Sequence, residues 1–360
     1  MLLDNHYGPD PRVGFEAELL EEAGIPTRII AWDRRPLSRA SDPPGEHPEI
    51  VRVAVPAQSG GGLRSVMGLA RFGVRVWRRR KQLFRDGALI VVHDVYLLPL
   101  GSALARSVRL PFVYDAHEEY GRMEATRYAP WLLRLVTSIE GRLARGAVVV
   151  VVPGASRVPR WEGVLPRPPI VLPNLVRREA IPLEPVPAEW DLLHAGTIAD
   201  IRRPDLLVEL AQLRPDLRIA IAGRGKGADR IARAAAELPN LTYLGWCPDS
   251  SALFTRTRAV YYGLDPKHPY SDVACPNTLY EALSHRKPLI FFCGGEMAQL
   301  AAEFKIGIRC QPSVAELSAA VDHAFTDSNW EFETAWRAVW ERAETQLFVD
   351  AIETAAQRPD

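Results

Sequence analysis

Short runs of β-branched and aliphatic residues alternate with helical patterns from one end of this 360-residue chain to the other. Continuous apolar strands separated by helices are typical of parallel sheets that are covered on both faces. The predicted strands are residues 2–3, 28–31, 89–93, 112–115 and 148–152 in the first half, and 191–195, 218–222, 241–244, 259–262 and 289–292 in the second. The pattern therefore predicts an α/β protein with doubly wound sheets.

A proline-rich stretch divides this alternation into two parts. Nine prolines fall between residues 153 and 189, and proline is unfavourable inside both helices and sheets. A chain of this length suits two domains better than one core. We predict a Rossmann-like domain over 1–172, a linker over 173–189 and a second Rossmann-like domain over 190–329. The tail, 330–360, is predicted to be a final helix that packs back toward the N-terminal domain.

Helical patterns fill the intervals between the predicted strands. The expected helices cover residues 13–23, 63–85, 205–213, 229–238, 278–284 and 297–304. Ser313 with Glu316 three residues later forms a capping-box pattern, which predicts the start of a further helix.

Composition narrows the classes of protein to which the chain can belong. Its formal net charge is zero, so no global field favours a nucleic-acid partner. The four cysteines have neither a CxxC pair nor zinc-ligand spacing, which indicates a reduced, cytoplasmic chain. No run reaches the roughly 20 apolar residues that span a bilayer, and the first residues lack the apolar core of a signal peptide. No aspartate-rich metal motif is present, so we expect neither a metal nor a cofactor.

Two glycine turns follow predicted strands in the second half, at the edge where such sheets bind ligands. The first leads from Gly196 to Arg202 and Arg203. Glycine lets the backbone approach a ligand, and a guanidinium can hold a diphosphate through a bidentate fork. The second turn contains Gly223 and Lys226 and has the composition of a phosphate cradle. Each turn, taken alone, is also explained by an ordinary strand-to-helix connection with solvated cations.

Two further motifs open helices in the second half. In the first, Asn277 precedes Glu281, and we expect this carboxylate one turn into a helix, where it can accept hydrogen bonds from both hydroxyls of a ribose. The alternative is a first-turn glutamate that stabilises its own helix dipole. The second motif is Gly294-Gly295-Glu296, where free backbone amides suit a phosphate or a sugar hydroxyl. All four motifs in order, each at a strand end, favour a nucleotide site.

In this order the motifs resemble glycosyltransferase family 4, the nucleotide-sugar-dependent retaining enzymes with the GT-B fold. The resemblance runs from the Gly196 turn through the Pro-Asn-x-Leu-x-Glu-Ala segment to the double glycine, and in the first half it includes residues 10–13, 93–94, 113–118 and 173–174. It implies two Rossmann-like domains that face a central cleft. It also implies a hexosyltransferase that moves a sugar from a UDP- or GDP-linked donor to an acceptor hydroxyl, with retention and without metal.

The resemblance assigns roles to the matching residues. Arg202 would hold the donor diphosphate, Glu281 the ribose, and the amides around Gly294 and Gly295 the phosphate and sugar. His117 would reach from the N-terminal domain to the transferred sugar, so His117 and Arg202 are the catalytic candidates. The alternative for His117 is a histidine that caps a strand end.

The remaining candidates lie on the acceptor side of the N-terminal domain. These are His93, Asp94, Asp115 and Glu118, of which Asp115 is expected to orient its loop. A solvated loop pair is the alternative for His93 and Asp94. The acceptor itself is left open between a sugar, a glycolipid and a small metabolite.

The chain also departs from the family pattern. Many members carry a second glutamate eight residues before the position of Glu281, where this chain has Val273. The position after Gly196 is often basic and here is Thr197, so Lys226 or Arg203 would have to supply that cation. These differences leave two rival functions open: a nucleotide-sugar epimerase on the same fold, and a non-catalytic module that binds a nucleotide-sugar.

One predicted helix, 63–85, is strongly basic and also carries an apolar stripe. Such a helix can lie on an anionic membrane surface, which would place the cytoplasmic protein peripherally at the membrane. The alternative is a helix packed on the first sheet with a solvated basic face.

Overall fold

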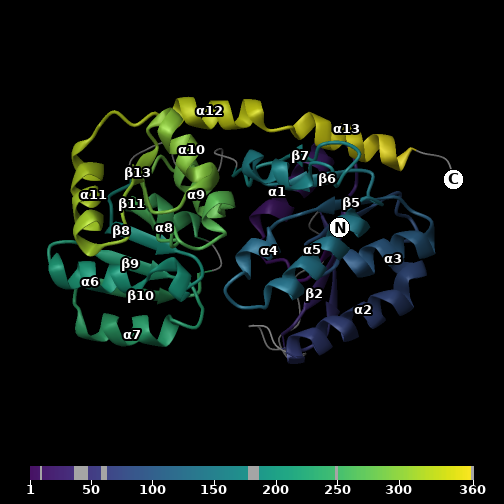
Figure 1. Cartoon of the computed structure of the whole chain (residues 1–360), viewed down its shortest axis with the longest axis horizontal. Helices are drawn as coiled ribbons and strands as arrows, with labels where there is room; N and C mark the ends of the chain where they lie inside the picture. Colours follow the sequence, from purple (N-terminus) through teal and green to yellow (C-terminus); the bar gives the residue numbers. More distant parts are fainter. Residues whose placement is uncertain (9, 36–47, 58–62, 177–185, 248–249, 358–360) are drawn as a thin grey trace. The chain divides into compact units, whose positions relative to one another are not determined.

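A computed structural model of the chain describes every residue except 9, 36–47, 58–62, 177–185, 248–249 and 358–360. The chain forms two compact units (Figure 1). Unit 1 comprises Met1–Pro173 and Ala343–Asp360, and unit 2 comprises Asn174–Arg342. Each unit has one parallel sheet with helices on both faces, which confirms the predicted α/β class.

The sheet of unit 1 has seven strands in the order β3-β2-β1-β4-β5-β6-β7. The strands are β1 (Leu2–Leu3), β2 (Arg28–Asp33), β3 (Glu49–Ala54), β4 (Ile90–His93), β5 (Phe112–Asp115), β6 (Val150–Val152) and β7 (Ile170–Val171). The helices are α1 (Pro11–Glu22), α2 (Leu63–Leu83), α3 (Leu98–Val108), α4 (Tyr120–Met123), α5 (Pro130–Ala144), the 3₁₀ helix η2 (Ala155–Trp161) and α13 (Thr345–Ala356). The strand order reverses between β1 and β4, the position where doubly wound sheets bind ligands.

The sheet of unit 2 repeats this topology with six strands in the order β10-β9-β8-β11-β12-β13. The strands are β8 (Trp190–Ala195), β9 (Ile219–Ala222), β10 (Leu241–Gly245), β11 (Thr257–Tyr262), β12 (Leu289–Phe291) and β13 (Gly307–Arg309). The helices are α6 (Asp205–Leu213), α7 (Ala228–Glu237), α8 (Ser251–Thr255), α9 (Asn277–Ser284), α10 (Gly295–Phe304), α11 (Val314–Thr326), α12 (Phe332–Arg342) and the short η3 (Asp200–Arg202) and η4 (Ser271–Val273). Here the order reverses between β8 and β11.

Local signals set where several helices begin. Asp10 caps α1, because its carboxylate accepts a hydrogen bond from the amide of Val13, and Pro11 supplies a preset φ at the first helical position. The hydroxyl of Ser313 accepts a hydrogen bond from the amide of Glu316 at the start of α11. The helix predicted from that pair is therefore confirmed.

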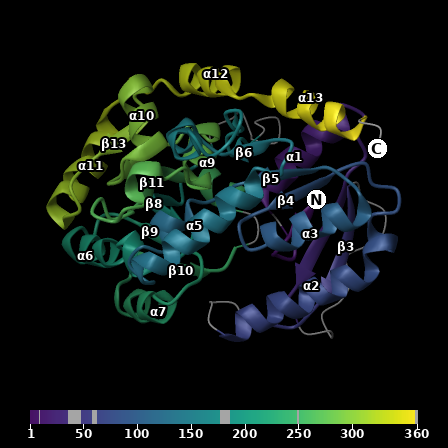
Figure 2. The same ribbon diagram turned by 45° about the vertical axis from the view of Figure 1, so that its right-hand side comes forward.

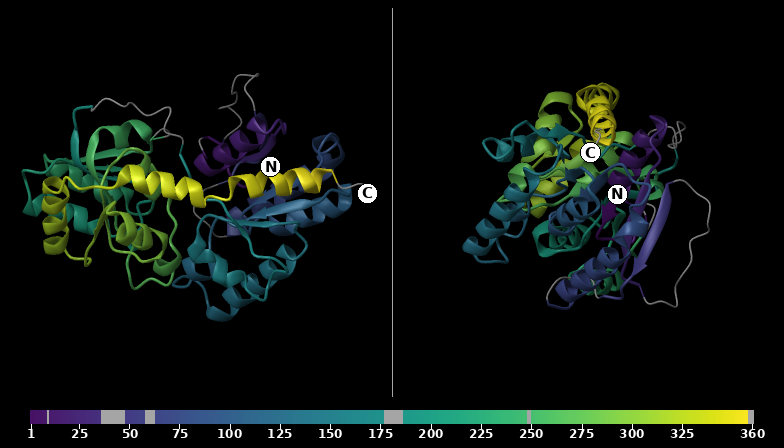
Figure 3. Two further views of the ribbon diagram at one scale, coloured as in Figure 1. Left: turned by 90° about the horizontal axis from the view of Figure 1, so that it is seen from above. Right: turned by 90° about the vertical axis from the view of Figure 1, so that its right-hand side faces the viewer.

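The helices of each unit divide between the two faces of its sheet. In unit 1, α2, α3 and α5 cover one face over a core that contains Phe72, Val76 and Leu104. On the other face α13 lies along α1 (Figure 3). In unit 2, α6, α7 and α11 share one apolar core, and α12 contacts both α9 and α10 on the opposite face.

The single C-terminal helix predicted for 330–360 is wrong. Within its described part the tail forms two helices, α12 in unit 2 and α13 in unit 1, separated at Ala343 and Glu344. The break between α12 and α13 is caused by hydrogen bonds to strand β7. The amide of Glu344 donates to the carbonyl of Val171 at 3.0 Å, and its carboxylate accepts from the amide of Val171 at 2.6 Å. A residue bonded in this way to a strand edge cannot also continue a helix.

The middle of the predicted linker of 173–189, residues 177–185, lies outside the described residues. Asn174, at its start, belongs to unit 2 and donates to the carbonyl of Cys275 at 3.3 Å. The strands β3, β7 and β13 were not predicted. All three are edge strands of their sheets, and β3 is mostly half-buried, so they lack the continuous apolar runs that mark central strands.

Candidate functional site

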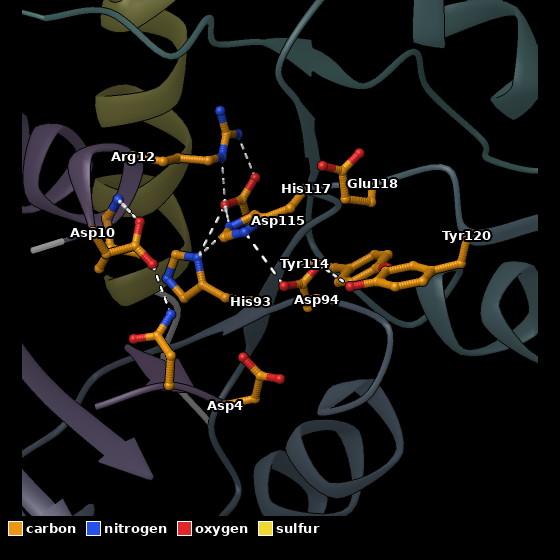
Figure 4. A network of polar contacts seen from close by, with 12 residues as sticks. Asp4, Asp10, Arg12, His93, Asp94, Tyr114, Asp115, His117, Glu118 and Tyr120 are labelled. Atoms are coloured by element: carbon orange, nitrogen blue, oxygen red, sulfur yellow. Dashed lines mark hydrogen bonds and ion pairs between the residues drawn. The ribbon is translucent and has the colours of Figure 1, made fainter. Parts of the chain in front are cut away.

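Charged and polar side chains gather in unit 1 at the carboxyl ends of β4 and β5 (Figure 4). His93 is the last residue of β4 and Asp115 the last residue of β5, and Arg12 lies in the first turn of α1. All three side chains are buried. They lie beside the reversal of strand order, where this topology favours a ligand.

Asp115 holds this cluster together. Arg12 donates from Nε to Oδ2 of Asp115 at 2.8 Å and from Nη2 to Oδ1, a bidentate fork. Nδ1 of His93 lies 3.0 Å from the same Oδ2, and Nε2 of His117 lies 2.5 Å from it. Burial disfavours the charged carboxylate, but Arg12 and His117 outweigh it and hold the pKa of Asp115 well below its ordinary value.

His117 is the cationic member of the cluster that reaches the surface. Burial alone would lower its pKa, but the carboxylates of Asp115 and Asp94 raise the pKa of His117 to about 10. Its Nδ1 lies 3.5 Å from Oδ2 of Asp94, and Oδ1 of the same carboxylate accepts a hydrogen bond from the hydroxyl of Tyr120 at 3.1 Å. Burial raises the pKa of Asp94 to about 7, against the opposing charge of His117. The site therefore presents an imidazolium beside a carboxyl that titrates near neutral pH.

Burial shifts the pKa values of two further members toward their uncharged forms. Burial lowers the pKa of His93 to about 4, and burial raises the pKa of Glu16, on α1, well above its ordinary value. The alternative of a solvated loop pair is therefore wrong for His93. Glu118 is instead partly exposed and pairs with Arg157 at 3.0 Å.

The ligand types in His93, Asp115 and His117 are those that bind a metal ion, and their nitrogen and oxygen atoms lie close together. The spacings do not fit such a site. His93 and His117 approach Asp115 to 3.0 and 2.5 Å, whereas ligands about 2.1 Å from a tetrahedral ion lie roughly 3.3 Å from one another. Arg12 also occupies both carboxylate oxygens. We therefore interpret the cluster as a hydrogen-bonded network around Asp115.

In unit 2, Arg202 ends the short helix η3 after β8. Its guanidinium stacks over the ring of Tyr262 at 4.5 Å and donates to the hydroxyl of that residue. Burial and, after it, the charge of Arg202 lower the pKa of His194 to about 4. Burial raises the pKa of Cys293 to about 12, and the same charge opposes that rise. Arg202 therefore lies near the carboxyl ends of β8, β11 and β12.

The two glycine turns of unit 2 pack against each other. The amide of Gly196 donates to the carbonyl of Ala222 at 3.0 Å, and that of Ile198 donates to the carbonyl of Arg224 at 3.0 Å. Gly223 has a φ of 144°, and a Cβ there would lie 1.8 Å from the carbonyl oxygen of Gly196. This close backbone approach requires glycine whether or not a phosphate binds.

Replacing Gly223 with alanine is therefore expected to lower the free energy of unfolding by roughly 2–3 kcal/mol, because the added Cβ meets backbone and the φ suits only glycine. Urea unfolding would measure the change. Gly24 also has a positive φ, 76°, but no atom lies within 4 Å of its added Cβ. Gly24→Ala therefore measures the cost of the positive φ alone. An equal loss of unfolding free energy in the two variants would contradict the argument that the added Cβ of Gly223→Ala meets backbone.

The cations near these turns differ in their surroundings. Arg203 forks onto Asp205 at 2.9–3.2 Å, which ties it to the start of α6. Lys226 is exposed on the second turn, and Arg224 beside it stacks over Trp246 at 4.3 Å. Of the two substitutes for a basic residue at Thr197, Lys226 is therefore the better placed.

Glu281 is the fifth residue of α9 and is only 9% exposed. Its Oε2 lies 3.9 Å from Nδ1 of His285, one turn later on the same helix. The alternative of a first-turn glutamate that stabilises the helix dipole is wrong, because α9 begins earlier than predicted and has no acidic residue in its first turn. Asn277 is the exposed first residue of this helix.

The double glycine packs on η4. The amide of Gly294 donates to the hydroxyl of Ser271 at 3.1 Å, so the prediction of a free amide there is wrong. Gly295 has a φ of 63°, and a Cβ on it would lie 2.9 Å from the backbone of Ala274. The N-cap residue of α10 is Gly294, which has no side chain to cap the helix, and the first turn carries Glu296. Val273 is buried in η4.

The structure thus brings the four acceptor-side candidates of unit 1 close to His117, but it also adds residues that sequence reasoning missed. In unit 1 these are Arg12, Glu16 and Tyr120, and in unit 2 they are Tyr262 and Ser271. The segment from Asp10 to Arg12, directly after β1, was the one available signal. Its position at the carboxyl edge of the sheet could have marked Arg12.

No family model matches the chain, and no curated protein matches its sequence. Solved structures match over its whole length. HepE of Anabaena, crystallised with UDP and glucose, is 14% identical with a TM-score of 0.70 and 99% of each chain covered. Sucrose-phosphate synthase from Thermosynechococcus elongatus is 14% identical with a TM-score of 0.70, covering 98% of this chain and 96% of that one.

A third match is the calicheamicin glycosyltransferase CalG4, 15% identical with a TM-score of 0.56, covering 99% of this chain and 98% of that one. At sequence identities of 14–15%, this structural similarity shows that the chains share a fold. Together with the sheets of seven and six parallel strands, it confirms the predicted GT-B fold.

Proposed function

We propose that this chain is a glycosyltransferase of the family 4 type. It would transfer a hexose from a UDP- or GDP-linked donor to an acceptor hydroxyl in carbohydrate biosynthesis, with retention, as a cytoplasmic enzyme. The observation that carries the proposal is Arg202, held near the carboxyl ends of β8, β11 and β12. HepE, which has the same fold, has been crystallised with UDP and with UDP-glucose.

The proposed donor site lies in unit 2. When the sugar leaves, a nucleoside diphosphate carries away negative charge, and fixed positive groups lower the barrier most when they are already in place. Arg202 is fixed by Tyr262, and the uncapped start of α10 adds the positive end of a helix dipole. These groups supply the charge that a metal would otherwise supply, so the proposed reaction needs no metal or cofactor.

Other residues of unit 2 have proposed roles in donor binding. Glu281 would bind the ribose, and Gly196, Gly223 and Lys226 would lie along the phosphates. Asn277, Arg203, Gly294, Gly295 and Glu296 complete the proposed donor set.

Unit 1 would bind the acceptor. His117 is proposed as the catalytic residue of this unit, since its imidazolium can stabilise negative charge on the donor. Asp94 is a candidate to accept the acceptor proton, because a pKa of about 7 suits a general base near neutral pH. His93 and Asp115 would position His117.

A thermal-shift panel of UDP, GDP, their sugars and the matching monophosphates tests the proposal. One diphosphate series is expected to raise Tm by several degrees, since saturation at about 100 times Kd adds roughly 2.7 kcal/mol of stability. Glu281→Gln should weaken that ligand about 10–100-fold, because ribose hydrogen bonds to a charged group are lost. Glu237→Gln, on the exposed part of α7, is the matched control. An equal response to every nucleotide, or to none, would contradict a donor site.

The two alternative functions, a nucleotide-sugar epimerase and a non-catalytic binding module, would give different results in activity assays. Incubation with donor alone would give an epimerised nucleotide-sugar in the first case. A donor that binds but is never consumed, with any acceptor class, would support the second. Transfer to an acceptor with release of the diphosphate excludes both.

A further inference from the structure

Helix α2 has two apolar faces, and only one of them is used in the core of unit 1. Phe72, Val76 and Leu83 are buried against the sheet and α3. Val66, Val74 and Trp77, on another side of the helix, remain 61, 50 and 38% exposed. A second apolar stripe on the outside of a helix is unusual, because it gains nothing from folding.

This outer stripe lines a groove between α2 and α3, which lie side by side (Figure 2). The groove has a volume of about 500 Å³. Tyr96, which is 47% exposed, and Pro99 and Leu100 form its α3 side. Gly73 also lines the groove, and a Cβ there would make an ordinary van der Waals contact with Leu100 at 3.6 Å.

Cations surround the stripe, and residues 63–83 contain no acidic residue. The exposed cations of α2 are Arg71, Arg75, Arg78, Arg79 and Lys81. Arg80 stacks over Trp77 at 4.6 Å and donates to Ser107 on α3 at 2.6 Å, so it holds the aromatic ring at the edge of the groove. The result is an apolar strip with a basic border.

We propose that the α2–α3 groove, defined by Val66, Val74, Trp77, Tyr96 and Leu100, docks unit 1 on an anionic lipid surface. The apolar side chains would enter the boundary of the acyl chains, and the arginines would meet the lipid phosphates. A nucleic acid would use the cations but not the aliphatic residues, and a second copy would bring like charges together. This inference does not depend on the proposed sugar transfer.

The contact would be peripheral. Among the described residues, no helix combines the length and apolar character needed to cross a bilayer. In a surface contact of this kind each cation near the membrane contributes about 1 kcal/mol to the binding free energy. Because this contribution is electrostatic, binding weakens as the salt concentration rises.

Flotation of the full chain with lipid vesicles tests the proposal. Vesicles that are about one-third phosphatidylglycerol should bind the protein, binding should fall as salt rises, and pure phosphatidylcholine should bind little. Replacing Arg71, Arg78 and Arg79 by glutamine should reduce partitioning about five-fold for each cation; Arg75 is left in place because its guanidinium donates to the carbonyl of Ala54 at the end of β3. Val66→Ser with Val74→Ser should reduce it about tenfold even at low salt.

Helix α5 offers the matched control. Leu135 and Ile139 are also exposed apolar residues of unit 1, and Leu135→Ser with Ile139→Ser should leave vesicle binding unchanged. All substituted residues are exposed, and the thermal response to nucleotides should stay as in the parent chain. The proposal is overturned if the parent binds both vesicle types equally or neither, or if only the α5 variant loses binding. A DNA duplex that displaces the vesicles, or a dimer that the Val66 and Val74 changes dissociate, would also overturn it.

Discussion

Turnover is expected to fall about 10²–10³-fold when Arg202 is replaced by alanine, because the charge of the leaving diphosphate then loses a preorganised partner. The loss should be in kcat more than in KM, since this charge develops in the transition state. Release of the nucleoside diphosphate from the donor, measured with saturating acceptor, would give the effect.

Arg230 supplies the matched control for this substitution. It is an exposed arginine of the same unit that pairs with Asp200 of η3 at 3.1 Å, and Arg230→Ala should retain most activity. Arg202→Lys should recover only part of the loss, because lysine keeps the charge without the planar fork. Unchanged turnover in Arg202→Ala would remove this residue from the catalytic assignment and leave nucleotide binding unexplained.

Asp115→Asn is expected to destabilise unit 1 by about 3–5 kcal/mol, because it leaves the buried guanidinium of Arg12 without its compensating charge. Chemical denaturation followed by circular dichroism would measure the loss. Asp216→Asn is the control, since Asp216 pairs with Arg214 on the surface of unit 2 and such pairs contribute at most about 1 kcal/mol. Similar losses in the two variants would contradict the central role of Asp115.

The same contact makes stability depend on pH. The pKa of His117 rises from an ordinary 6.5 to about 10 on folding, so the folded state holds this proton more tightly than the unfolded state. The resulting stabilisation is complete below about pH 6.5 and is lost as the pH rises through 10. Between pH 7 and 10 the parent chain should therefore lose stability. Asp115→Asn should show a shallower decline, because the strongest charge that raises the pKa of His117 is gone.

Much of the fold could be predicted from the sequence, because its signals act between near neighbours. The central strands β4, β5, β8 and β9 are apolar runs, and α6 begins and ends where its pattern predicts. The helix predicted over 13–23 begins two residues earlier, at Pro11, where Asp10 caps it. Three of the four edge strands, β3, β7 and β13, were not predicted, because they are short or only half-buried; β10, the fourth, was predicted from its apolar run.

The residue types of the candidate site could be predicted from the sequence, but the contacts between those residues could not. His93, Asp115 and His117 were selected from the first half, yet nothing local to them identifies Arg12, which is 103 residues from Asp115. Likewise, the glycines at 223 and 294 were attributed to ligand binding. Gly223 packs closely against the backbone of Gly196, and a Cβ on Gly294 would lie 3.0 Å from the carboxylate of Asp272, contacts that only the tertiary structure reveals.

The sequence by itself determined the parallel α/β architecture, the capped start of α11 and a basic helix with an apolar stripe at α2, since these depend on the order and spacing of adjacent residues. Tertiary structure decided the rest. It brought Arg12 to Asp115, turned His117 into a cation, and ended α12 before Glu344 so that this residue could bond to β7. The physical reason is that burial and charge act through space, and a residue's partners are chosen by strand order rather than by distance along the chain.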